Sequence, residues 1–233
     1  DYLVGPVHIR ARAKTQERLT YDLSEVLRLM DLANWYNKWI DHKTWHVVRE
    51  GMQDRNDIEL TSDMIKRFIS FLSHPARLPD LLRRLHDLRI LEIFIPAMEH
   101  ARCLVQFNEY HKYTVDEHCL LAVQRATEFE SRTDVLGDAY RNLPDKHLLH
   151  LALLLHDLGK GRPGDHSEVG GGLAVETGQR LELSSRQTAM LKLLVEKHLL
   201  MSNLALQHNI NDETIWLQLA REVGSPFGLQ MLY

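Results

Sequence analysis

The chain has 233 residues, of which 44% are hydrophobic and 26% charged, and its formal net charge is −4. These values are typical of a globular protein with a real core and exclude the strong positive charge of many nucleic-acid-binding chains. No apolar run reaches the roughly 18 residues that a membrane-spanning helix needs. We therefore expect neither nucleic acid nor membrane among its partners.

Two further features bear on where the protein works. Cys103 and Cys119 are the only cysteines, too few for a disulfide scaffold, which favours a reducing compartment. The first residues, DYLVGPVHIRARAK, lack the apolar segment of a secretory signal peptide. We expect a cytoplasmic protein. The start on Asp rather than Met suggests a piece of a longer one.

Helical periodicity dominates the first half of the chain, where apolar residues recur at i, i+3 and i+4 spacing. Amphipathic helical runs are predicted over residues 19–52, 59–74 and 78–96. Gly51 is the expected stop of the first run, and Thr61 or Ser62 is the expected N-cap of the second. Pro79 fits the first turn of the third run, which should close before Pro96.

The second half contains two sequences typical of capping boxes, T-V-D-E at 114–117 and S-S-R-Q at 184–187. Between them, DKHLLHLALLLHD (145–157) predicts a buried helix that Gly159 ends. The glycine-rich stretch GKGRPGDHSEVGGG that follows is predicted to be a loop at least as far as Ser167.

Histidines are frequent, 14 in the chain, and several interrupt otherwise apolar runs. Five candidate ligands fall near predicted helix ends or in the loop: His118, His156, Asp157, His166 and His198. Imidazole and carboxylate ligands suit a divalent ion such as Mn, Mg, Fe, Zn, Co or Ni. One or two such ions would lower the pKa of a bound water and neutralise charge on a phosphoryl oxygen.

The chain contains a second His-Asp pair, His86-Asp87, inside a continuing amphipathic run and without a following glycine. We interpret this pair as a surface feature, so the dipeptide alone is a weak signal. His156-Asp157 differs because the glycines after it let the backbone turn sharply and bring His166 back toward the same site.

Three stretches resemble the HD-type metal-dependent phosphohydrolases: YHKYTVDEH (110–118), LLLHDLGKGRPGDHSEVGG (153–171) and LVEKHLLMS (194–202). They are most similar to the HD domain of the bifunctional uridylyltransferase/uridylyl-removing enzymes of nitrogen regulation. The resemblance covers nearly the whole chain and is most specific over residues 107–202. It implies an all-α fold, with an HD helical bundle at 101–233 and a preceding helical region at 1–100.

The resemblance also implies an activity and the residues that carry it. In that family the HD domain is linked to hydrolysis of uridylyl-tyrosine on the PII signal protein. The implied metal ligands are His118, His156, Asp157, His166 and His198. Asp157 and Lys160 are the implied catalytic residues, with Lys160 pairing with a phosphate oxygen. His111, Tyr113 and Asp116 are placed on the substrate side, where ordinary loop packing is the alternative interpretation.

The sequence departs from the family pattern in two respects. Asn209 stands where the family has its last metal-binding Asp, and an amide oxygen without charge should hold the metal less tightly. His208 is a possible substitute ligand, whereas Asp212 is expected to cap the next helix. Second, neither the nucleotidyltransferase motif nor an ACT-like pattern occurs. This chain is therefore not expected to transfer UMP or to sense glutamine.

These observations leave two hypotheses of different kinds. The first is a metal-dependent phosphodiester hydrolase of the uridylyl-removing type. The alternative is a degenerate HD module, a regulatory or nucleotide-binding domain without turnover, which Asn209 favours. Hydrolases of free nucleotides fit less well, because neither acidic residues soon after His156-Asp157 nor a Gly-Tyr-Pro motif occurs.

Overall fold

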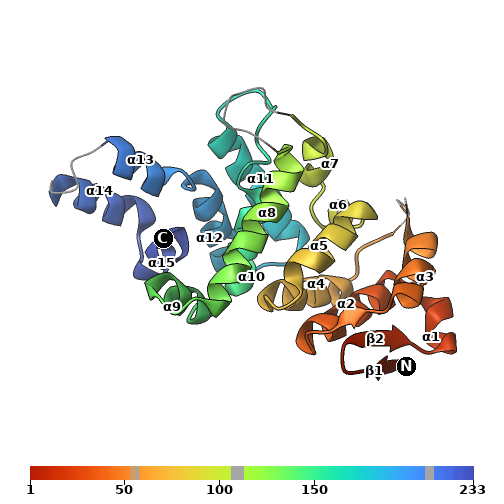
Figure 1. Cartoon of the computed structure of the whole chain (residues 1–233). Coiled ribbons are helices and arrows are strands. Elements are labelled where there is room, and N and C mark those ends of the chain that lie inside the picture. The colour runs from red at the N-terminus through yellow and green to blue at the C-terminus, as the bar shows by residue number, and fades with distance from the viewer. Residues whose placement is uncertain (54, 56–57, 106–112, 208–212) are drawn as a thin grey trace.

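The computed structural model describes residues 1–53, 55, 58–105, 113–207 and 213–233. Helices make up most of these residues and pack as a bundle, which confirms the predicted all-α class (Figure 1). The first elements of the chain lie at one end of the molecule, and helices α13 (Leu200–Gln207) and α14 (Glu213–Val223) lie at the other.

A small sheet at the N-terminus was not predicted. Its strands are β1 (Tyr2–Val4), β2 (His8–Ala11) and β3 (Trp39–Ile40), in the order β1-β2-β3. β1 and β2 pair antiparallel, whereas β2 and β3 pair parallel, with Ile9 opposite Ile40. Strands this short give no usable alternation of polar and apolar residues, so periodicity does not reveal them.

The helices of the first half are α1 (Ala13–Arg18), α2 (Leu23–Trp35), α3 (His42–Met52), α4 (Ser62–Ser73), α5 (Leu78–Asp87), α6 (Leu91–Phe94) and α7 (Ala97–Ala101). Thr61, one of the two predicted N-cap residues, caps α4. The amphipathic run at 19–52 contains two helices because Asn37 has a positive φ of 47° and Asp41 caps a new helix. Arg89, at φ 59°, likewise interrupts the predicted helix at 78–96.

The second half contains α8 (Val115–Glu128), the 3₁₀ turn η1 (Phe129–Ser131), α9 (Val135–Arg141), α10 (Lys146–Leu155), α11 (His166–Arg180), α12 (Ser185–Glu196), α13 (Leu200–Gln207), α14 (Glu213–Val223) and α15 (Pro226–Leu232). The capping box of Ser184 and Gln187 is confirmed. The box at Thr114 is wrong, because its side chain accepts no backbone N–H of α8. The expected N-cap Asp212 lies outside the described residues.

The predicted loop after Gly159 is shorter than expected. Asp165 accepts hydrogen bonds from the backbone N–H groups of Ser167 and Glu168, and α11 therefore begins at His166. The prediction of a loop as far as Ser167 is wrong because an Asp N-cap offsets the low helix propensity of the glycines that follow.

Helix α10 is the central helix of the bundle, with α4, α8 and α12 packed around it (Figure 1). Leu151, Leu154 and Leu155 are completely buried on it, which explains its nearly continuous apolar sequence. One buried cluster runs from Ile9 to Met231 and crosses residue 100 without a break. The division into 1–100 and 101–233 stays a prediction.

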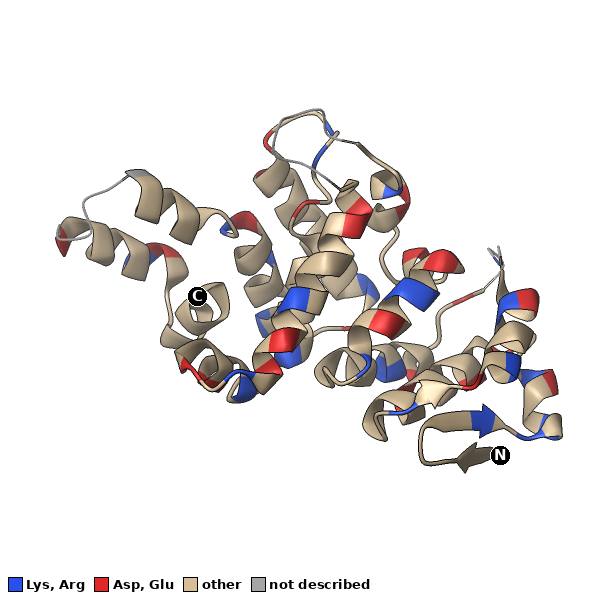
Figure 2. Cartoon of the chain, viewed as in Figure 1, with Lys and Arg blue, Asp and Glu red and all other residues tan. Residues whose placement is uncertain are grey.

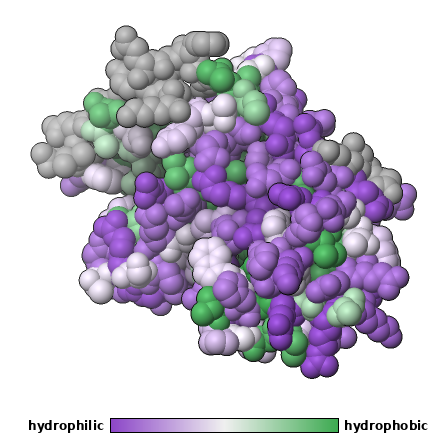
Figure 3. Space-filling model, turned by 45° about the vertical axis from the view of Figure 1, so that its right-hand side comes forward, coloured by the Kyte–Doolittle hydropathy of each residue, from purple (hydrophilic) through white to green (hydrophobic). Residues whose placement is uncertain are grey.

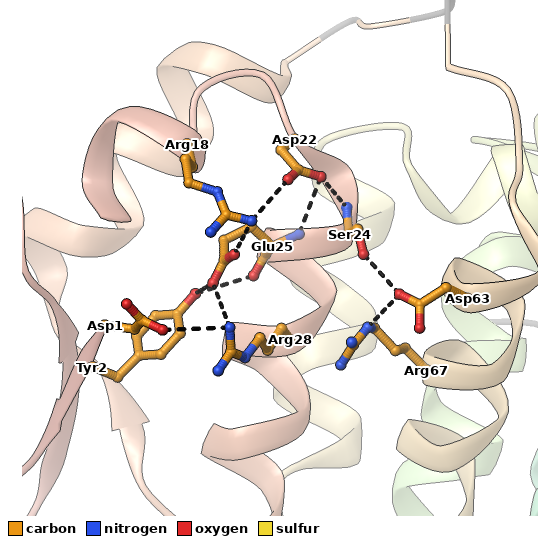
Figure 4. A network of polar contacts seen from close by, with 9 residues as sticks. All are labelled: Asp1, Tyr2, Arg18, Asp22, Ser24, Glu25, Arg28, Asp63 and Arg67. Carbon is orange, nitrogen blue, oxygen red and sulfur yellow. Dashed lines mark hydrogen bonds and ion pairs between the residues drawn. The ribbon is translucent and has the colours of Figure 1, made fainter. Parts of the chain in front are cut away.

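A network of polar contacts ties the first strand to the helices behind it (Figure 4). The Glu25 carboxylate is buried, accepts a 2.7 Å hydrogen bond from the Tyr2 hydroxyl and lies 2.6 Å from the Arg18 guanidinium. Ser24, the residue before Glu25, donates to Asp63 of α4. These partners satisfy a carboxylate that would otherwise be costly to bury.

The surface is mixed in charge and mainly hydrophilic. Basic and acidic residues alternate along the helices in Figure 2, without a long stretch of one sign. On the face drawn in Figure 3, apolar residues form small patches separated by hydrophilic ones. Within the described residues, every helix is too short or too polar to cross a bilayer.

Candidate metal centre

The C-terminal end of α10 presents the His156-Asp157 pair at the edge of the core. The Asp157 side chain is only 5% exposed and that of His156 13% exposed. Because Leu154 and Leu155, the two residues before the pair, are fully buried, they hold the pair in a fixed position. The His156 Nε2 atom lies 3.4 Å from Asp157 Oδ2.

Helix α8 runs beside α10 and brings His118 to the same place. His118 Nε2 is 3.2 Å from His156 Nε2 and 3.4 Å from Asp157 Oδ2. Its side chain is 40% exposed, so His118 faces solvent more than His156, Asp157 and His198 do. Residues 38 positions apart in sequence thus meet because two helices pack side by side.

His198 follows the end of α12 and approaches Asp157 from the other side. Its Nε2 atom lies 3.7 Å from Asp157 Oδ1, whereas His118 and His156 lie near Oδ2. The His166 ring, in the first turn of α11, is 5.6 Å from the His198 ring, centroid to centroid. The carboxylate of Asp157 therefore lies between two pairs of imidazoles.

Gly159 makes the close approach of α11 possible. A Cβ atom at this position would lie 2.1 Å from the backbone oxygen of His166, closer than real contacts allow. Only a residue without a side chain lets the start of α11 pack directly on the turn that follows Asp157. The predicted return of His166 toward the site is observed, and Asp157, His166 and His198 form one group.

Two imidazoles are oriented by backbone carbonyls. His156 Nδ1 lies 2.8 Å from the Leu153 oxygen, and His198 Nδ1 lies 2.7 Å from the Val195 oxygen. A carbonyl only accepts, so each Nδ1 carries the proton and donates it. Each Nε2 is left with a lone pair beside Asp157. This is the usual arrangement by which outer groups orient metal-ligating histidines.

The residues form two groups of possible ligands that share Asp157, one with His118 and His156 and the other with His166 and His198. Within each group the ligand atoms lie within 4.8 Å of one another. Nitrogen and oxygen donors of this kind, with lone pairs converging on one carboxylate, fit a divalent ion on either side of Asp157.

Burial and charge also prepare these groups for a cation. Burial lowers the pKa of His156 to about 4 and lowers that of His198, so both rings are neutral near pH 7. Burial alone raises the pKa of Asp157, but His156 and the hydrogen bond from Lys160 lower it below its usual range. Neutral imidazoles beside an ionised carboxylate are the forms that bind metal.

The remaining predicted residues have mixed outcomes. Lys160 lines the site, but its Nζ donates to Asp157 Oδ2 at 2.8 Å, so its pairing with phosphate stays a prediction. Tyr113 is 51% exposed and is not among the residues that line the cavity described below. His111 and Asn209 lie outside the described residues, and their roles stay predictions.

The interpretation of His86-Asp87 as a surface pair is wrong for His86, which is only 7% exposed. Its Nε2 donates to Asp116 at 3.1 Å, while its Nδ1 accepts from Arg102. Asp116 is buried too and also accepts from the backbone of Cys103, which fits the alternative interpretation of ordinary packing; its place on the substrate side stays a prediction. This network anchors the start of α8, two residues before His118.

A cavity of about 630 Å³ opens beside both groups of ligands. Besides the histidines, Asp157 and Lys160, its lining includes Arg162, which is not among the predicted site residues. The signal that marks Arg162 in the sequence is its place in Gly-Arg-Pro-Gly, between residues that fix the backbone.

Comparison with known proteins agrees with this geometry, because residues 115–224 match the family model described as HD domain. Residues 115–224 form an HD domain. The match includes every possible ligand of the two groups around Asp157. HD domains bind divalent metals, and the donor groups found here fit that property.

Three proteins similar to most of the chain carry the name bifunctional uridylyltransferase/uridylyl-removing enzyme. One from Cereibacter sphaeroides is 36% identical over 80% of this chain. Others from Acinetobacter baumannii and Pasteurella multocida are 33% and 34% identical over 71% and 72% of it. The chain with its HD domain spans only 19–20% of the length of these three relatives.

Proposed function

We propose that this protein is a metal-dependent phosphodiester hydrolase of the uridylyl-removing type. The observation that carries the proposal is the position of Asp157, shared by two groups of histidines at the wall of an open cavity. The similarity to uridylyl-removing enzymes supports a uridylyl-tyrosine ester on a PII-type signal protein as the substrate.

Each side chain has a defined part in this proposal. His118 and His156 would hold a divalent ion on one side of Asp157, and His166 and His198 one on the other. Such an ion supplies Lewis-acid chemistry, acidifying a water ligand and withdrawing charge from a phosphoryl oxygen. Lys160 holds Asp157 in place through its 2.8 Å hydrogen bond. The cavity has the size usual for small-ligand sites.

The test is hydrolysis in the presence of Mn²⁺, first of a chromogenic phosphodiester and then of uridylylated PII protein. The wild type should release the product, and a His156→Ala/Asp157→Ala variant should not. Equal rates for the two proteins would exclude this mechanism. A wild type that binds Mn²⁺ but releases neither product would favour the degenerate regulatory module, in which the amide of Asn209 leaves the metal site incomplete.

A further inference from the structure

We propose that Arg162 is the phosphate-binding residue of the cavity, the side chain that anchors an anionic phosphoryl group beside the metal ligands. Arg162 lines the same cavity as His118, Asp157 and His198. It follows the metal-binding turn directly, since its backbone N–H donates to the oxygen of Gly159.

The first support is an unsatisfied donor. The Nε atom of Arg162 is buried and has no hydrogen-bond partner. Among the described residues, four other buried side-chain atoms share this state, on Arg77, Glu92 and Asp116, and none of those residues lines the cavity. Buried donors in folded proteins almost always have a partner, so an orphan on a cavity wall points to a bound ligand.

The second support is the contrast with Lys160, the other cationic side chain of the lining. The Lys160 ammonium lies 2.8 Å from Asp157 Oδ2, so its charge is already matched by a carboxylate. Arg162 makes no hydrogen bond or ion pair through its side chain within the described residues. Of these two cationic side chains, Lys160 is paired with Asp157, and Arg162 is available to bind an incoming anion.

The third support is the backbone on either side, which Pro163 and packing against Leu104 hold in place. Gly161 and Gly164 have positive φ values of 75° and 101°, and Pro163 fixes its own φ. A Cβ on Gly161 would lie 2.9 Å from Leu104, so the loop is packed against the segment after α7. A side chain presented by a fixed loop gives up little conformational entropy on binding.

The chemistry of guanidinium determines the class of ligand. Its planar fork donates two parallel hydrogen bonds to the oxygens of a phosphate, whereas ammonium acts as a point charge. The ligand class is therefore a phosphate ester with two accessible non-bridging oxygens. A role for Arg162 in catalysis rests on the proposed phosphodiester hydrolysis. Its role in binding an anion rests on the cavity alone.

The experiment measures binding of inorganic phosphate by calorimetry, with Mn²⁺-supplemented protein and with metal-free protein. Arg162→Gln should weaken phosphate binding about 10- to 100-fold, because a charge-assisted bidentate contact is lost. Arg162→Lys should recover part of the affinity. Bound Mn²⁺, measured by elemental analysis, should be the same in all three proteins.

The matched control is Arg186→Gln, which removes the same charge from an exposed residue at the opposite end of α12 from His198. This variant should bind phosphate as the wild type does. Phosphate affinity unchanged by Arg162→Gln, an equal loss in the control, or no phosphate binding by the wild type would each overturn the assignment. Phosphate binding through Arg162 without any ester hydrolysis would uphold it while refuting the proposed function.

Discussion

Replacing Asp157 with Asn is the sharpest perturbation of this site, because the carboxylate is shared by both groups of ligands. The substitution keeps the shape of the side chain and removes its charge. It also leaves the His156 and His198 rings oriented by their backbone carbonyls. Any loss of metal binding is therefore assigned to the carboxylate itself.

The expected magnitude follows from linkage between binding and folding. A metal at about 100 times its Kd stabilises the native state by about 2.7 kcal/mol. For a chain of this length, each kcal/mol raises Tm by about 2–4 °C. Adding Mn²⁺ should thus raise the Tm of the wild type by about 5–10 °C, and Asp157→Asn should lose most of that increase.

The assay is thermal unfolding of each protein with and without Mn²⁺, so that each variant serves as its own reference. Asp87→Asn is the matched control, because Asp87 belongs to the other His-Asp pair and is exposed. The control should keep the full increase. If Asp157→Asn responds to Mn²⁺ as strongly as the wild type, Asp157 does not hold the metal.

Three other substitutions probe the scaffold. Burial lowers the pKa of His150 from 6.5 to about 4, so the unfolded state takes up a proton first as the pH falls. About 3 kcal/mol of the free energy of unfolding is therefore lost between those two pH values. The variant His150→Gln should flatten this decline in acid denaturation curves. His86→Leu should destabilise the fold by about 1–3 kcal/mol in urea, because Asp116 loses a buried partner, and no change would contradict the network. Gly159→Ala should cost about 1–3 kcal/mol and lower Mn²⁺ affinity, whereas Gly172→Ala, with open space around its Cβ, should do neither.

Much of the helical framework follows from the sequence because it depends on near neighbours. The capping box of Ser184 and Gln187 and the N-cap at Thr61 involve residues three apart, and both were predicted correctly. The same holds for the turn after His156-Asp157, where an apolar helix meets glycine. The prediction failed where neighbouring residues favour different structures. At His166 an Asp N-cap starts a helix, although the glycines that follow favour a loop.

The all-α class and the chemistry of the candidate ligands therefore follow from the residues alone, whereas the packing of the helices sets which of those ligands meet. The two His-Asp pairs look alike locally, yet His86 is buried against Asp116, 30 residues away, and Asp157 lies between histidines of three other helical segments. The Nε atom of Arg162, buried without a hydrogen-bond partner, is likewise a result of tertiary packing. Such contacts depend on how α8, α10, α11 and α12 pack, and local periodicity carries no information about partners so distant in the chain.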